Sequence, residues 1–161
     1  MPHPDLTVTA GKDEPAQVDL AGTLSGARWA VTGARSSTRR IDIYVAGTFV
    51  GGRDVFAPSS LQTLPVVDGS IQGVPGYGAV VEGDVEGQGV SVIVTSDDGR
   101  TARLPTSPFY ERSNFAVAIP AGIDVATLTF IAADGSVLAV ADVPDIPLGS
   151  GGGFLNLIPR R

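Results

Sequence analysis

Val90-Ser-Val-Ile-Val-Thr-Ser-Asp-Asp-Gly-Arg-Thr-Ala-Arg-Leu104 consists of two alternating apolar runs joined by an Asp-Gly turn. A similar arrangement returns in Val125-Ala-Thr-Leu-Thr-Phe-Ile-Ala-Ala-Asp-Gly-Ser-Val-Leu-Ala-Val140. Asp-Gly between β-branched runs is a strong hairpin signal, because glycine adopts the positive φ of a tight turn and alternation places every second side chain on one face. Both stretches are therefore predicted to be β-hairpins.

The rest of the chain extends this pattern. The 12 prolines and 21 glycines recur at short intervals along the 161 residues, so no window has the periodicity of a long helix. We predict an all-β fold, an antiparallel β-sandwich of Ig-like character with about ten short strands. Loops are expected at 54–62 and 68–76, which are rich in glycine, proline and serine. The expected strands are 6–10, 17–20, 28–33, 40–46, 48–50, 64–67, 78–85, 90–96, 101–104, 115–119, 127–132 and 137–142.

Residues 1–148 are expected to form a single domain, followed by a glycine-rich linker at 149–153 and an apolar tail at 154–161. The tail either adds a strand to this domain or to a partner, or is the stub of a longer segment. Docking onto the chain's own domain is favoured, because a free apolar run promotes aggregation. Trp29, the only tryptophan, is expected to anchor the core rather than to serve as a ligand platform.

Composition excludes several function classes. The chain has 17 acidic and 11 basic residues and a net charge of −6, which argues against binding to nucleic acid. No apolar run is long enough for a membrane span, and the start lacks the features of a signal peptide. There is no cysteine, hence no disulfide, thiol nucleophile or thiolate metal site.

Candidates for catalysis are few. His3, the single histidine, lies beside two prolines at a terminus, where catalytic geometry is hard to hold. Glu82-Gly-Asp84-Val-Glu86-Gly87 resembles the first half of a calcium loop, but Ile93 stands where a bidentate glutamate is needed, and an acidic turn between two strands is favoured. Asp97 and Asp98 are explained by turn chemistry. We therefore expect no enzyme and no cofactor.

Binding residues are sought among the aromatic and apolar side chains. Tyr77, Phe109, Tyr110 and Arg112 are candidates for the rim of a ligand or partner site, although burial of Phe109 or Tyr110 at the end of a sandwich is favoured. In the tail the candidate contacts are Phe154, Leu155 and Leu157. Four arginines lie close together in the sequence, Arg28, Arg35, Arg39 and Arg40. They are expected to be solvated charges on strand edges and turns, and a small anion-binding patch is the alternative.

A resemblance covers residues 29–142. Its elements are Trp29 in a short strand, Gly76-Tyr77-Gly78 at the entry to a later strand, the Val90–Thr101 hairpin segment, Asn-Phe-Ala-Val-Ala-Ile-Pro-Ala-Gly at 114–122 and Ala-Asp-Gly at 133–135. In this order they resemble soluble extracytoplasmic β domains of actinobacterial membrane-anchored or secreted proteins. The resemblance implies a two-layer β domain that senses or binds outside the membrane. Members often carry a cysteine pair in the front half, which this chain lacks.

Composition and resemblance together predict a non-catalytic binding or sensing module, the extracytoplasmic part of a tethered or secreted bacterial protein, with a protein or cell-envelope component as partner. A cytoplasmic location stays open. The alternative is a structural assembly subunit, of a virion or a secretion apparatus, that forms homo-oligomers by exchange of strands or of the C-terminal tail. A carboxylate-based enzyme is the third hypothesis.

Overall fold

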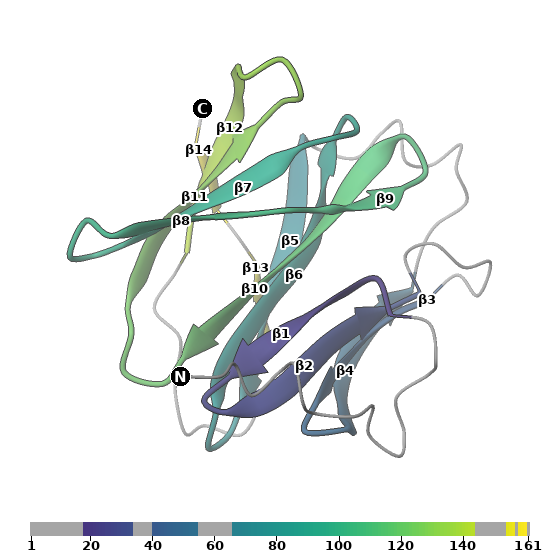
Figure 1. Ribbon diagram of the computed structural model, residues 1–161, viewed down its shortest axis with the longest axis vertical. Coiled ribbons are helices and arrows are strands. Elements are labelled where there is room, and N and C mark those ends of the chain that lie inside the picture. The colour runs from purple at the N-terminus through teal and green to yellow at the C-terminus, as the bar shows by residue number, and fades with distance from the viewer. Residues whose placement is uncertain (1–17, 34–39, 55–65, 144–153, 157, 161) are drawn as a thin grey trace.

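The computed structural model describes residues 18–33, 40–54, 66–143, 154–156 and 158–160. These residues form an all-β fold of three antiparallel sheets and contain no helix. The N-terminal sheet has the order β1-β2-β3-β4, the central sheet β13-β5-β6-β10-β9, and the outer sheet β14-β12-β11-β7-β8 (Figure 1). The all-β class and the antiparallel pairing are as predicted.

The strand bounds locate each sheet in the sequence. The N-terminal sheet contains β1 (Leu20–Leu24), β2 (Ala27–Thr32), β3 (Arg40–Val45) and β4 (Thr48–Asp54). The central sheet contains β5 (Val67–Val74), β6 (Gly78–Glu86), β9 (Ser107–Phe109), β10 (Arg112–Pro120) and β13 (Phe154–Asn156). The outer sheet contains β7 (Ser91–Ser96), β8 (Thr101–Leu104), β11 (Val125–Ile131), β12 (Val137–Asp142) and β14 (Ile158–Arg160).

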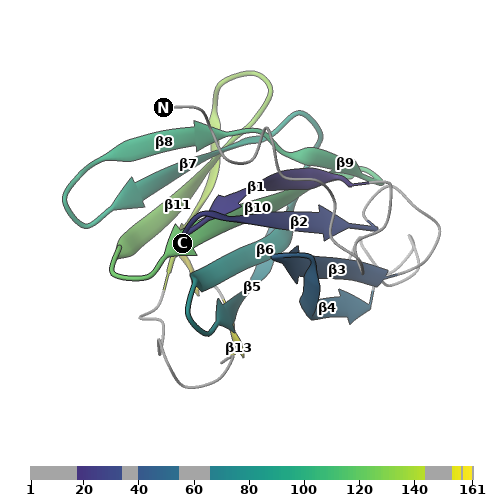
Figure 2. The same ribbon diagram turned by 60° about the horizontal axis from the view of Figure 1, so that its bottom comes forward.

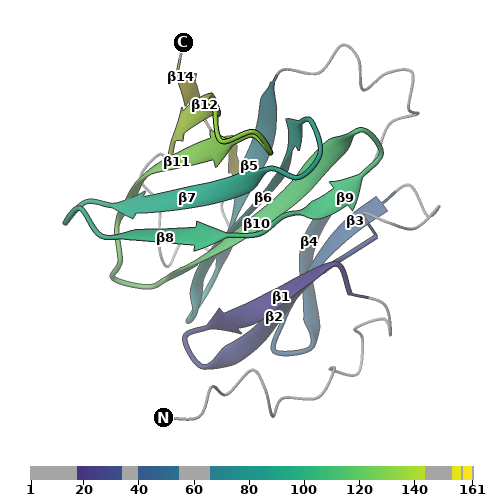
Figure 3. The ribbon, with the colours of Figure 1, turned by 45° about the horizontal axis from the view of Figure 1, so that its top comes forward.

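The central sheet lies between the other two, as Figures 2 and 3 show. Its middle strands β6 and β10 are buried on both faces over most of their length. Odd-numbered side chains such as Val81 and Phe115 pack with Phe130 in the core shared with the outer sheet. Even-numbered side chains such as Val80 pack with Trp29 in a second core, shared with the N-terminal sheet. The expected core role of Trp29 is therefore confirmed.

Both Asp-Gly hairpins are confirmed, as β7–β8 and β11–β12. Gly99 and Gly135 have φ of +87° and +90°, values that glycine adopts without strain. Asp98 accepts hydrogen bonds from the Ser96 hydroxyl and the Arg100 amide, and Asp134 accepts two from Ser136. These bonds hold the pKa of each aspartate below its usual value.

Two predictions about the front half are wrong. The predicted loop at 68–76 is mostly strand β5, because pairing with β6 and β13 stabilises an extended conformation that the local glycines do not favour. The first described strand is 20–24 rather than 17–20. The predicted strand 6–10 and residues 55–62 of the other predicted loop lie outside the described residues.

The C-terminal tail pairs with this chain's own domain, as favoured from the sequence. Strand β13 pairs with β5 at one edge of the central sheet, and β14 pairs with β12 at one edge of the outer sheet. Phe154 and Leu155 are in β13, opposite Gln72 and Ile71, while Leu157 lies outside the described residues. The tail therefore covers the edges of two different sheets.

Candidate functional site

Three turns meet at one end of the central and outer sheets, toward the top of Figure 1. They are residues 87–90 between β6 and β7, 110–111 between β9 and β10, and 132–136 between β11 and β12, and we call them the turn cluster. The Gln88 side-chain amide donates a hydrogen bond of 2.8 Å to the carbonyl oxygen of Tyr110. A Cβ atom built on Gly89 would lie 3.3 Å from the Cβ of Ala133. The first turn therefore contacts both others.

Three exposed apolar side chains among the described residues lie at this end. Five large hydrophobic side chains are exposed in the described part of the chain, and Val66, Tyr110 and Val137 all lie at the end that carries the turn cluster. Their exposed fractions are 41%, 41% and 61%. The other two, Phe49 and Ile123, lie on the N-terminal sheet and at the opposite end of the outer sheet.

Tyr110 adopts a strained backbone conformation. Its φ is +53°, and the next residue in its two-residue turn is Glu111. Ser25 and Ala46 have similar φ values, but each precedes a glycine of positive φ, as hairpin turns prefer. A non-glycine residue in this conformation costs roughly 1–2 kcal/mol. Glycine at position 110 would avoid that strain but would lose the contact between the Tyr110 and Phe109 rings.

The rim predicted from the sequence is only partly assembled. Phe109 is 1% exposed, in the core beside the N-terminal sheet, so the burial reading is confirmed for this residue. Tyr110 stacks edge-on against it, with 5.2 Å between ring centroids. Arg112 is buried. Tyr77 lies near the opposite end of β6, because the register pairs Arg112 with Glu86 and Pro120 with Gly78.

A buried polar cluster lies between the N-terminal and central sheets. Glu82 and Asp84 on β6 face the N-terminal sheet, beside Arg112 and Asn114 on β10, and all four are at most 6% exposed. Arg53 on β4 reaches across to them: its Nε and Nη2 atoms donate to the two Glu82 oxygens at 2.8 and 3.0 Å. Nη2 also lies 2.9 Å from Asp84 Oδ2.

The remaining bonds of the polar cluster lie within the central sheet. Arg112 Nε donates to Asp84 Oδ1, and Asn114 Nδ2 donates to Glu82 Oε2 and the Gly83 carbonyl, both at 2.9 Å. Burial raises the pKa of Glu82, and the charge and hydrogen bonds of Arg53 oppose that rise. The cluster contains two carboxylates and two guanidinium groups, so its charges balance.

This cluster overturns the sequence interpretation of residues 82–87. The sequence predicts a strand over 78–85 and, for the overlapping residues 82–87, an acidic turn with calcium as the alternative; the strand is confirmed, since residues 82–86 belong to β6, and the turn begins only at Gly87. Among the described residues no group of three or more acidic or histidine side chains is placed to hold a metal ion. The missed signal is the alternation of acidic residues with Gly83 and Val85, which is the pattern of a two-faced strand. Arg53 and Asn114 carried no local signal.

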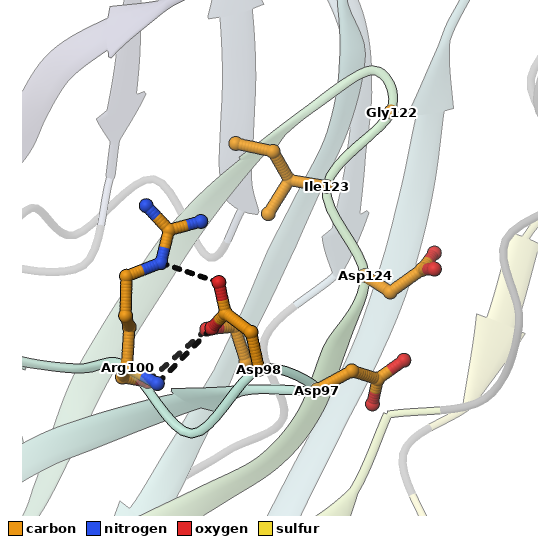
Figure 4. Close-up of a pocket in the computed structure, with 7 residues that line it drawn as sticks. Asp97, Asp98, Arg100, Gly122, Ile123 and Asp124 are labelled. Carbon is orange, nitrogen blue, oxygen red and sulfur yellow. Dashed lines mark hydrogen bonds and ion pairs between the residues drawn. The ribbon is translucent and has the colours of Figure 1, made fainter.

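A shallow pocket of about 200 Å³ lies at the opposite end of the outer sheet (Figure 4). It is lined by the β7–β8 turn and by residues 122–124. Asp98 is engaged by Ser96 and Arg100, whereas the carboxylates of Asp97 and Asp124 point away from Arg100. The pocket is smaller than typical small-molecule sites, which begin near 300 Å³.

The other sequence candidates are not brought together. Arg28 is near the start of β2 and Arg40 at the start of β3; because the strands are antiparallel, the two residues lie at opposite ends. Arg40 pairs with Asp42 at 2.7 Å. His3, Arg35 and Arg39 lie outside the described residues.

Comparisons of the chain with known protein families, with curated proteins and with solved structures find no match. In the described part of the chain, no helix is long and apolar enough to cross a membrane.

Proposed function

We propose that β5–β12 form an Ig-like sandwich, to which the N-terminal sheet and the tail strands are added. If these eight strands are named A, B, C, C′, D, E, F and G in chain order, the central sheet has the order A-B-E-D and the outer sheet G-F-C-C′. Immunoglobulin domains have the same strand order. The core between these two sheets, which includes Phe115 and Phe130, supports this assignment.

On this fold the function we propose is that of a non-catalytic binding module that uses the turn cluster. In this nomenclature its turns are the B–C, D–E and F–G connections, and the B–C and F–G loops of variable domains bind ligands. The observation that carries the proposal is the concentration of exposed apolar residues there, with Tyr110 held in a conformation that costs stability. Tyrosine offers a large, rigid contact surface with a polar tip, which suits a protein partner.

The resemblance to actinobacterial extracytoplasmic domains supports placing this module outside the membrane, in a tethered or secreted protein. A protein or another component of the cell envelope is then the partner that we propose. The formal net charge agrees with this choice in one respect, because a value of −6 disfavours binding to nucleic acid.

The test is selection of binders from a displayed library of random 12-residue peptides against the natural chain. We expect binders whose affinity falls at least fivefold on Tyr110→Ala, in line with hot-spot truncations that cost 1 kcal/mol or more. Phe49→Ala is the matched control, since Phe49 is a similarly exposed aromatic, at 46%, on another sheet. Binders that ignore Tyr110 and Val137, or that depend on Phe49 equally, would contradict the proposal.

A second candidate function, the structural assembly subunit, is favoured by the tail. Strands β13 and β14 are short edge strands that follow a glycine-rich segment in the sequence, and the same pairing with β5 and β12 of another copy would link two chains. Sedimentation velocity on the natural chain and on a chain ending at Gly149 tests this function. Assembly that disappears with the tail supports it, and monomers at all concentrations contradict it.

A further inference from the structure

Arg53 is the side chain through which the N-terminal sheet enters the buried polar cluster. It lies near the end of β4, an edge strand of that sheet, and its side chain is 23% exposed. Gly51, two residues earlier, allows β4 to approach the central sheet closely, since a Cβ atom there would lie 2.5 Å from the Gln72 side chain. The guanidinium also lies over the ring of Phe109, 5.6 Å from its centroid.

In the described part of the chain, the side chains that contact this guanidinium belong to the central sheet. Glu82, Asp84 and Phe109 form the walls of the space that the Arg53 guanidinium occupies, and each of these residues is at most 2% exposed. They are held by partners on the same sheet: Asn114 donates to Glu82, and Arg112 donates to Asp84. β6, β9 and β10 are hydrogen-bonded neighbours, so this arrangement does not depend on the N-terminal sheet.

Without Arg53, the walls have an uncompensated charge. Among the described residues, two buried carboxylates then face one buried cation, Arg112, which leaves a net charge of −1 in a buried place. Two buried acceptors of the cluster, Asp84 Oδ2 and Asn114 Oδ1, have no hydrogen-bond partner in the described structure, and Asp84 Oδ2 is held only by its ion pair with Arg53. A buried carboxylate that lacks a counter-ion is strongly destabilising, so the walls require a cation.

The geometry selects the kind of cation. The two Glu82 oxygens accept parallel hydrogen bonds from Nε and Nη2, while the same Nη2 lies beside Asp84 and the planar group lies over an aromatic ring. A guanidinium supplies this fork and flat face, whereas an ammonium ion is a compact point charge.

We infer that the central sheet contains a preformed guanidinium-binding pocket, formed by Glu82, Asp84 and Phe109, which Arg53 fills within the chain and which accepts a guanidinium supplied from outside. Its ligand class is the arginine side chain or a small alkylguanidinium. Occupation of the pocket couples the N-terminal sheet to the central sheet, because Arg53 is the cation that the former contributes. This inference is independent of the turn cluster.

Chemical rescue of Arg53→Ala tests the pocket. Unfolding is followed by the fluorescence of Trp29, which is buried in the core between the two sheets. Methylguanidinium is added up to about 50 mM, well below the molar concentrations that denature proteins, at constant ionic strength. At five times its Kd, we expect the folding equilibrium constant of the variant to rise about sixfold. If the variant is unfolded in buffer, the same addition should restore the folded signal.

Three controls define the outcome. Ethylammonium should rescue much less, because it lacks the fork. The double variant Arg53→Ala/Glu82→Gln should lose rescue, and Arg100→Ala, which removes an exposed arginine paired with Asp98, should not respond. Absence of rescue in both Arg53→Ala and the milder Arg53→Gln, or equal rescue by ethylammonium, would overturn the inference.

Discussion

Replacement of Arg112 by methionine is the most informative perturbation of the buried polar cluster. Arg112 is 6% exposed and donates to Asp84, which is fully buried, and more weakly to the carbonyl oxygens of Val66 and Asp84 at 3.4 Å. Methionine keeps the apolar stem and removes only the charge and the donors. Loss of one partner of a buried ion pair costs about 3–5 kcal/mol, a large part of the 5–15 kcal/mol that stabilises a typical domain.

The assay is urea unfolding followed by Trp29 fluorescence between pH 5 and 8. At pH 8 we expect the full loss of about 3–5 kcal/mol, because Glu82 and Asp84 then share one cation. As the pH falls, the folded variant takes up a proton in the cluster more readily than the unfolded chain does, so the loss should shrink. The variant should therefore depend on pH more steeply than the natural chain does.

Two comparisons make this reasoning refutable. Arg103→Met removes an exposed arginine that donates to the Ser91 hydroxyl, and we expect a change within about 0.5 kcal/mol. The double variant Arg112→Met/Asp84→Leu removes both charges and should recover most of the lost stability. A loss below about 1 kcal/mol at pH 8, or no recovery in the double variant, would show that the buried charges are not coupled as described.

Three further predictions concern residues buried between the sheets. Burial raises the pKa of Glu82 above 4.5, so the folded chain holds a proton there more tightly than the unfolded chain does. As the pH rises from about 4.5, the natural chain should therefore lose stability relative to the Glu82→Gln variant. Urea titrations of both proteins at several pH values measure this difference in unfolding free energy. Phe130→Ala should cost about 3–5 kcal/mol in the same assay, since its buried ring lies 4.8 Å from that of Phe115; a cost under 1 kcal/mol would contradict the packing. Gly83→Ala should lower the unfolding free energy by about 1–3 kcal/mol or more, because the added Cβ would lie 2.1 Å from the Asp68 carbonyl oxygen. Gly51→Ala should cost less, because its Cβ would meet the flexible side chain of Gln72.

Sequence reasoning predicts the strands that depend on local signals. Both Asp-Gly hairpins are found where the alternation placed them, because the turn and the two runs lie within about fifteen residues of each other. The predicted strand 78–85 is also present, as β6. Strand β5 was missed because its glycines resemble a loop, and only its neighbours β6 and β13 favour an extended conformation there.

The candidate site was predictable only in part. Tyr110 and Phe109 were singled out as aromatic residues beside a predicted strand, but the sequence cannot say that one is exposed and the other buried. Tyr77 was grouped with them wrongly, because the register that separates it by the length of β6 is not a local property. Val66 and Val137 join Tyr110 at one end only once the sheets are packed.

By itself, the sequence determined the fold class, the two hairpins, the absence of cysteine chemistry and the acidic charge. The tertiary structure alone decided that the described residues form three sheets, that β6 and β10 are buried on both faces, and that the acidic face of β6 is neutralised. The physical reason is sequence separation: Glu82 bonds to Arg53, 29 residues away, and Asp84 to Arg112, 28 residues away. Such pairings depend on which sheets pack together, and turn chemistry or alternation within one strand does not specify that packing.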